Sequence, residues 1–217
     1  MDGGRGEGIG MKRRKKAGAM VLAVMLALMP VRVLGGGTDT AAGEIEVTAR
    51  AVMLALMPVR VLGGGADATA GEIEVTARAA VAMEAETGRV LYEKNADEVL
   101  PMASTTKVMT ALVVLENAEL DDRVEIDGRM AGIEGSSMNL DAGEELTVEQ
   151  LLYGLMLRSG NDAAVALAIH VAGSVEGFAE KMNAKAAEMG LMHTHFCNPH
   201  GLPAQGHETT ARELARI

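Results

Sequence analysis

Aromatic side chains are scarce in this chain of 217 residues, which has no tryptophan, two tyrosines and two phenylalanines. Hydrophobic residues still make up 48% of the sequence, so alanine, leucine, valine and methionine must build the core. Alanine, leucine and methionine are strong helix formers. The composition therefore favours a helical core, and the length suggests one domain with or without appendages.

Cysteine and basic residues are scarce as well. Cys197 is the only cysteine, which excludes an intrachain disulfide and is neutral about the cellular compartment. From Ala79 onward, ten Lys and Arg residues stand against 22 Asp and Glu residues. Because nucleic-acid binding requires a basic face, we predict no nucleic-acid partner for a domain this acidic.

The basic residues that are present include a cluster near the N-terminus. Five consecutive basic residues, Lys12 to Lys16, precede an apolar run at 17–30 and a stretch of small residues. This is the layout of a secretory signal peptide, and the apolar run is short for a membrane span. A buried core helix is the alternative, but it does not explain the basic cluster. We predict a signal peptide, for which Met11 is a candidate start.

A segment of 28 residues then occurs twice, at 23–50 and 51–78, with three differences between the copies. Two units are too few to bury a shared face as a solenoid does. We interpret the repeat as a recent tandem duplication or an error in the gene sequence. We therefore expect residues 1–78, signal peptide and repeat together, to be poorly ordered and outside a domain at 79–217.

That domain should begin with a β-hairpin and continue as helices. Residues 79–85 and 89–94 read as two strands around a turn at 86–88. A helix is expected from Ser104 to about Asn117. Thr147 and Gln150 have the spacing of a capping box, and the apolar residues that follow have a helical period. These are Val148, Leu151, Leu152, Leu155 and Met156.

Two more helices are expected after a break at "RSGND". Asp162 can cap one that ends at Gly173, and Ser174 can start another that Gly190 closes. The final residues, "TTARELARI", predict a further helix.

The helix at 104–117 carries a lysine at the start of an apolar run. Residues three apart share a helix face, so Ser104 and Lys107 point the same way. Burial favours a neutral lysine, which can take the serine proton and create a nucleophile. Ser-x-x-Lys alone is a weak signal, and its ordinary interpretation is a helix start with a solvated lysine.

A second motif strengthens the hypothesis. Ser159-Gly160-Asn161 forms a tight break between two apolar helices, where a hydroxyl and a carboxamide can face a cleft. Its ordinary interpretation is a glycine turn with an Asn cap. Ser-x-x-Lys together with Ser-x-Asn is the signature of penicillin-binding proteins and serine β-lactamases.

The sequence from about Ala79 onward resembles the N-terminal part of the serine-type D-alanyl-D-alanine carboxypeptidases, the low-molecular-mass penicillin-binding proteins of peptidase family S11. The resemblance rests on "VLYEKNAD", "PMASTTKVMTAL", "GSSMNLDAGEELTVEQLLYGLMLRSGNDAAVALA" and "FCNPHGL". It implies an α/β fold of the β-lactamase and transpeptidase type, an antiparallel sheet flanked by helices. It also implies removal of the terminal D-alanine from peptidoglycan stem peptides, inhibition by β-lactam antibiotics, and a bacterial, exported protein of the cell envelope.

The resemblance assigns roles by motif. Ser104 would be the acylated nucleophile and Lys107 its base. Ser159 would pass a proton to the leaving D-alanine. Asn161 would bind the substrate amide and hold Lys107. No cofactor is implied, and an uncleaved signal or a C-terminal anchor would be the route to membrane association.

The family's third motif, Lys-Thr-Gly or Lys-Ser-Gly on a later strand, does not occur after Asn161. We therefore expect a truncated fold, in which the N-terminal hairpin and a helical subdomain are present and the remaining sheet strands are missing. A non-catalytic relative that binds cell wall, or an inactive fragment, is the alternative. A serine β-lactamase is a lesser one, because the nearest match to its deacylating Glu motif is "EKMN" at Glu180, inside an expected helix.

Other polar residues have simpler interpretations. His193 and His195 could share a strand face, but no third ligand is clearly placed to make a metal site. We expect His200 and His207 to order the loop between them. Cys197 should be a small buried side chain, since no His or Asn motif accompanies it as in thiol proteases.

Overall fold

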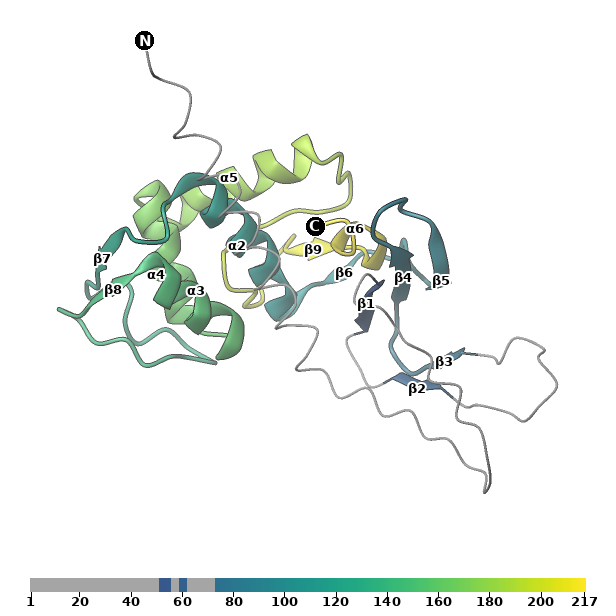
Figure 1. The fold of residues 1–217 in the computed structure, drawn as a ribbon, viewed down its shortest axis with the longest axis horizontal. Coiled ribbons are helices and arrows are strands. Elements are labelled where there is room, and N and C mark those ends of the chain that lie inside the picture. Colours follow the sequence, from purple (N-terminus) through teal and green to yellow (C-terminus); the bar gives the residue numbers. More distant parts are fainter. Residues whose placement is uncertain (1–50, 56–58, 62–72) are drawn as a thin grey trace, which may run out of the picture. The chain divides into compact units, whose positions relative to one another are not determined.

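The computed structural model describes residues 51–55, 59–61 and 73–217 (Figure 1). These residues divide into two units. The larger unit contains residues 99–209 and Ile217, and the smaller contains the described residues up to Glu98 together with 210–216. Each unit has a hydrophobic cluster of its own.

The smaller unit is built on a three-stranded antiparallel sheet of order β1-β4-β5. Its strands are β1 (Ala51–Ala55), β4 (Ala80–Glu84) and β5 (Val90–Lys94). The β4–β5 hairpin confirms the predicted one. Its turn is held by the Glu84 carboxylate, which accepts hydrogen bonds from the backbone N–H groups of Glu86 and Thr87 at 3.1 Å each.

A second strand pair and a short helix complete this unit. Strand β2 (Val59–Val61) pairs antiparallel with β3 (Ile73–Val75). Helix α6 (Ala211–Leu214) is the short helix predicted at the end of the chain, and the Thr210 side chain caps it.

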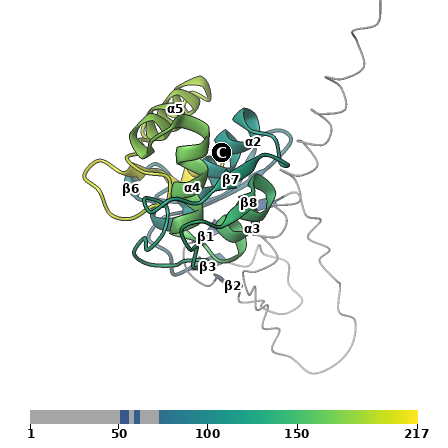
Figure 2. The same cartoon turned by 90° about the vertical axis from the view of Figure 1, so that its left-hand side faces the viewer.

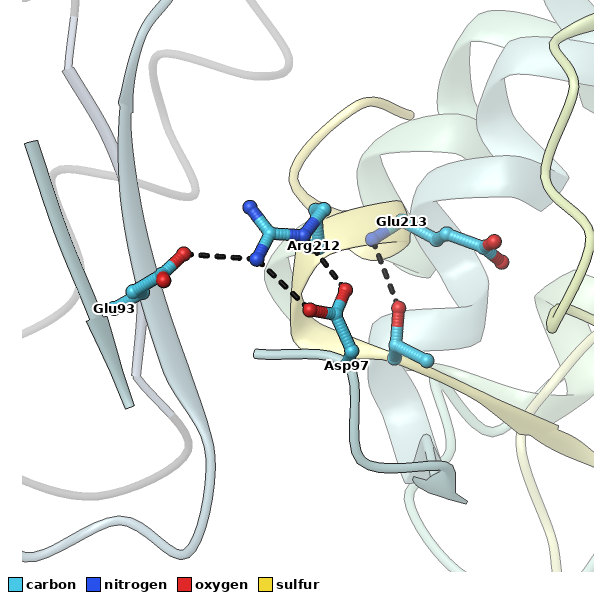
Figure 3. A network of polar contacts seen from close by, with 5 residues as sticks. Glu93, Asp97, Arg212 and Glu213 are labelled. Carbon is cyan, nitrogen blue, oxygen red and sulfur yellow. Dashed lines mark hydrogen bonds and ion pairs between the residues drawn. The ribbon is translucent and has the colours of Figure 1, made fainter. Parts of the chain in front are cut away.

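Arg212 ties α6 to the hairpin within the smaller unit (Figure 3). Its Nε donates to Asp97 Oδ1 at 2.6 Å, and its Nη2 donates to Glu93 Oε2 and Asp97 Oδ2 at 2.8 and 2.9 Å. The Arg212 backbone N–H also donates to the Ala96 carbonyl. One arginine thus joins strand β5, the segment after it and α6.

The strands of the second repeat copy differ from our expectation. We expected residues 51–78 to lie outside the fold, yet β1 pairs with β4 and β2 pairs with β3. The apolar segment "AVMLA" extends the edge of the sheet by pairing with β4, a contact that the local sequence does not predict. The predicted signal peptide and the first copy lie outside the described residues, and the boundary at Ala79 stays a prediction.

Helices dominate the larger unit. They are the one-turn 3₁₀ helix η1 (Ala103–Thr105) and the α-helices α2 (Thr106–Asn117), α3 (Val148–Leu157), α4 (Asn161–Ala172) and α5 (Val175–Glu188). Helix α4 packs against α2, α3 and α5 (Figures 1 and 2). Its residues 163–168 are all buried and four of them are alanine, which lets the neighbouring helices approach closely.

The local signals at the helix ends were mostly read correctly. Thr147 and Gln150 form the predicted capping box at α3, and the Ser174 side chain caps α5. Glu180 lies within α5, as expected. Asp162 is a correction: Gly160 is the N-cap of α4, and Asp162 lies inside the first turn.

Two short strand pairs border these helices. Strand β6 (Leu100–Pro101) pairs with β9 (Glu208–Thr209), and β7 (Arg123–Glu125) pairs with β8 (Glu145–Thr147). Within the described part of the chain, no single helix is long and apolar enough to span a membrane, although α4 and α5 pass that test together as a pair bent by 83°.

Candidate active site

Ser104 lies at the entrance to α2, in the 3₁₀ turn that precedes it. The helix itself begins at Thr106, two residues later than expected. Ala103 has a φ of 44°, a left-handed conformation that costs a residue with a side chain free energy. The turn places the Ser104 side chain in an exposed position, where a substrate can reach it.

Lys107 is the base candidate, and its side chain is buried, with 1% of the residue exposed. Its Nζ has three acceptors: His200 O at 2.7 Å, Asn161 Oδ1 at 2.8 Å and Ser104 Oγ at 3.3 Å. A neutral amine has two protons and one lone pair. If the two short bonds keep the protons, the lone pair is left to face Ser104 Oγ.

The burial of Lys107 also changes its acidity. Desolvation disfavours the ammonium form and lowers the pKa of Lys107 from 10.5 to about 8. A useful fraction of the side chain is then neutral near physiological pH. The geometry and the pKa thus agree on a lysine that can accept the Ser104 proton.

Asn161 begins α4 and is held in one orientation. Its Oδ1 accepts from Lys107, while its Nδ2 donates to Glu134 O at 2.6 Å. Its backbone N–H donates to Ser136 O at 2.7 Å. Because the amide oxygen must face the lysine, only one rotamer of the amide satisfies both partners.

The next residue, Asp162, anchors the loop at 136–140 and does not act as a cap. Its carboxylate accepts from Ser137 Oγ at 2.5 Å and from the backbone N–H groups of Met138, Leu140 and Ala163 at 2.9 to 3.1 Å. Burial alone would raise the pKa of Asp162, but these hydrogen bonds outweigh it and hold the pKa below its usual value. The ionised side chain therefore fixes the loop whose Ser136 carbonyl accepts the Asn161 backbone N–H.

Ser159 is the site residue that the structure connects least. It has a φ of 55° and is half-buried in the break between α3 and α4. Its hydroxyl makes no hydrogen bond with any residue that the structure describes. Hydrogen bonds thus join Ser104, Lys107 and Asn161, whereas Ser159 is placed near them only by its position before Asn161 in the chain.

Sequence reasoning missed the loop at 197–207 as part of the site. The His200 carbonyl holds Lys107, and Thr110 Oγ1 donates to the Pro199 carbonyl at 2.6 Å. The signal was present in α2, where Thr106 and Thr110 flank Lys107 in a helix that is otherwise apolar as far as Leu115. Polar side chains in that position need buried partners.

The two histidines order this loop, as predicted. His200 Nδ1 accepts the backbone N–H of Leu202 at 3.1 Å, and His207 Nδ1 accepts that of Cys197 at 2.9 Å. Burial above all lowers the pKa of each ring to about 4. Cys197 is half-buried where we expected a buried side chain, and its thiol contacts the Gln205 carbonyl at 3.4 Å.

Comparison with known proteins identifies the family to which the chain belongs. Residues 66–217 match the model of peptidase family S11, described as D-alanyl-D-alanine carboxypeptidase. The chain belongs to this family. The resemblance inferred from the motifs is therefore confirmed, and the family is one of serine-type hydrolases.

Several S11 relatives are similar over the same region. The chain is 45% identical over 141 residues to the D-alanyl-D-alanine carboxypeptidase DacF of Bacillus subtilis. The aligned region covers 63% of this chain and 36% of DacF. It is 42% identical over 148 residues to the carboxypeptidase of Streptomyces sp. strain K15, covering 63% of this chain and 51% of that enzyme. The chain thus spans about a third to a half of these relatives.

Solved structures of S11 proteins share the fold. DacD from Francisella tularensis is 39% identical with a TM-score of 0.64, covering 66% of this chain and 36% of that one. Penicillin-binding protein 5 from Haemophilus influenzae is 35% identical with the same TM-score, covering 67% and 44%. The expected α/β fold is therefore confirmed.

Proposed function

We propose that the protein is a serine-type D-Ala-D-Ala carboxypeptidase that removes the terminal D-alanine from peptidoglycan stem peptides. The observation that carries this proposal is the placement of Lys107 Nζ, which is buried and bonded to Asn161 Oδ1, His200 O and Ser104 Oγ. A lysine that served only the fold would need no partner at an exposed serine.

The reaction would run through an acyl-enzyme. Lys107 takes the proton of Ser104, and Oγ attacks the carbonyl carbon between the two D-alanines. The new C–O bond forms, the C–N bond breaks, and Ser159 relays the proton held by Lys107 to the leaving D-alanine amine. Water then hydrolyses the ester and restores Ser104.

The neighbouring groups would bind the peptide and the developing charge. Asn161 Oδ1 accepts from Lys107 Nζ at 2.8 Å, and the same amide would also hydrogen-bond the substrate backbone. The Ser104 backbone N–H, in the turn before α2, would be one donor to the oxyanion. The second donor would come from the strand that carries the family's third motif.

The substrate also suggests where the protein works and what inhibits it. Stem peptides lie outside the cytoplasmic membrane, which agrees with the predicted signal peptide and supports a location in the cell envelope of a bacterium. A β-lactam mimics the D-Ala-D-Ala amide, so penicillins should acylate Ser104. Membrane attachment would come from an uncleaved signal or a C-terminal anchor.

Release of D-alanine from a diacetylated Lys-D-Ala-D-Ala peptide tests the proposal, with the protein expressed from its complete gene. We expect turnover in the parent and none above background in Ser104→Ala. A parent protein that binds the peptide without releasing D-alanine would instead support a non-catalytic wall-binding relative.

A further inference from the structure

The peptide unit between Ala103 and Ser104 is held from its carbonyl side by the Thr106 backbone N–H and by two side chains other than the serine and lysine of the Ser-x-x-Lys motif. The Ala103 carbonyl accepts the Thr106 hydroxyl at 2.7 Å, and Thr106 Oγ1 in turn lies 2.7 Å from His207 Nε2. All three residues belong to the larger unit. Thr106 and His207 are buried, with 0% and 4% of their surfaces exposed.

The direction of each hydrogen bond in this chain is determined. His207 Nδ1 accepts the Cys197 backbone N–H, so it has no proton. A neutral ring then has its proton on Nε2 and must donate to Thr106 Oγ1. The single proton of the threonine hydroxyl is left for the Ala103 carbonyl. The chain therefore runs from the Cys197 N–H through His207 and Thr106 to the Ala103 carbonyl.

Fixing this carbonyl also fixes the Ser104 N–H. The C=O of Ala103 and the N–H of Ser104 are parts of one planar trans peptide, so they point in opposite directions. A contact that holds the oxygen therefore aims the hydrogen. The left-handed φ of Ala103 means that this orientation is not the one the local backbone prefers.

A glycine supports the same peptide from the other chain segment. A Cβ on Gly201 would lie 1.9 Å from the Ala103 oxygen and 3.0 Å from the Ser104 nitrogen. The backbone of the 197–207 loop thus lies directly against this peptide unit. The loop and the His207–Thr106 pair therefore both hold the Ala103–Ser104 peptide in one orientation.

We propose that Thr106 and His207 are positioning residues that aim the Ser104 backbone N–H at the substrate oxyanion. This inference rests on the proposed function, because it gives the aimed N–H its purpose. Neither side chain touches the reacting atoms. Both act through the Ala103–Ser104 peptide.

The test compares Thr106→Val with Thr106→Ser in the protein expressed from its complete gene. Valine keeps the shape and removes the hydroxyl, while serine keeps the hydroxyl. Thr147→Val is the control, because it removes a hydroxyl that bonds the Gln150 backbone N–H at the start of α3, outside the Ser104 turn and the 197–207 loop. The readouts are the Ser104 amide and His207 ring nitrogen signals by NMR, and the rate of acylation by a labelled penicillin.

We expect Thr106→Val to shift the Ser104 amide signal and to slow acylation by about 10- to 100-fold, since removal of a whole oxyanion donor typically costs about 10²–10³. Thr106→Ser should stay within about threefold of the parent, and Thr147→Val should leave the Ser104 amide signal unchanged. His207 should have its proton on Nε2 in the parent.

Three results would overturn the inference: a proton on His207 Nδ1, a Ser104 amide that does not move in Thr106→Val, or equal losses of acylation in Thr106→Val and Thr147→Val. A parent protein that is not acylated at all would instead count against the proposed function. The Ser104 amide signal and the His207 ring nitrogen signals would still decide whether the peptide is held as we infer.

Discussion

At the scale of single residues, Lys107 carries most of the chemistry. Its burial has a cost that the fold offsets with acceptors from two distant segments, Asn161 and His200. The third acceptor is the serine that the lysine must deprotonate. The rate of acylation should therefore depend on whether the Lys107 amine is protonated.

The pH dependence of acylation follows from the lowered pKa of Lys107. Because only the neutral amine can accept the Ser104 proton, the rate should rise with pH and level off above about 8. Below that pKa the rate should fall about tenfold per pH unit. Stopped acylation reactions with a labelled penicillin, run from about pH 6 to about pH 10, measure this profile. A rate that is flat below pH 8 would show that Lys107 is not the base.

At the scale of elements, the site depends on two loops packed against the starts of α2 and α4. The loop at 136–140 is fixed by Asp162, and the loop at 197–207 is fixed by α2. The Ser136 carbonyl of the first loop accepts the Asn161 backbone N–H, and the His200 carbonyl of the second accepts from Lys107 Nζ. Changes that leave the catalytic residues intact but move a loop should therefore reduce activity.

Gly201→Ala tests the second loop. The new Cβ would lie 1.9 Å from the Ala103 oxygen, and the φ of +90° at this position disfavours a side chain. Because the obstacle is backbone, we expect a loss of about 1–3 kcal/mol in the free energy of unfolding and a large loss of acylation. Denaturant unfolding and penicillin labelling measure the two effects. Gly128→Ala is the control, since its Cβ would meet nothing within 4 Å.

Asp162→Asn tests the first loop. Both carboxylate oxygens accept backbone N–H groups, so either orientation of the amide sets its NH₂ against an N–H. We expect a loss of about 1–3 kcal/mol, measured by denaturant unfolding. The exposed Asp141→Asn should change stability by less than about 0.5 kcal/mol. Equal stability of the two variants would mean that Asp162 does not anchor the loop.

Local sequence predicted the elements better than the contacts between them. The hairpin, the capping box at Thr147 and the cap at Ser174 follow from residues a few positions apart. The face shared by Ser104 and Lys107 does too. The bond from Lys107 to His200 joins residues 93 apart, and no short-range pattern encodes it. The capping role predicted for Asp162 was wrong for the same reason. Its carboxylate bonds residues at 137–140, and no short-range pattern predicts those partners.

At the scale of the whole molecule, the chain spans 36% of DacF and 51% of the Streptomyces K15 enzyme. Its 217 residues contain Ser104, Lys107, Ser159 and Asn161 but no Lys-Thr-Gly or Lys-Ser-Gly after Asn161. The third motif would supply an oxyanion donor and a lysine for the substrate carboxylate.

The 217-residue chain alone should therefore release little or no D-alanine from diacetylated Lys-D-Ala-D-Ala. One missing oxyanion donor typically costs about 10²–10³ in rate, and the missing lysine adds to that. Residues 79–217 expressed without β1 would expose the edge of β4 and should be unstable or prone to aggregate. A soluble, cooperatively folded 217-residue chain with ordinary turnover would show that these residues suffice.

The central claim is that Lys107 activates Ser104 for acylation, and peptide mapping after reaction with a labelled penicillin tests it most directly. In the protein expressed from its complete gene, the label should be found on Ser104. It should be absent from Lys107→Arg, because arginine keeps the charge but cannot act as a base near neutral pH, while the exposed Lys181→Arg should label normally. Label on another residue, or labelling of Lys107→Arg within a few fold of the parent, would contradict the account.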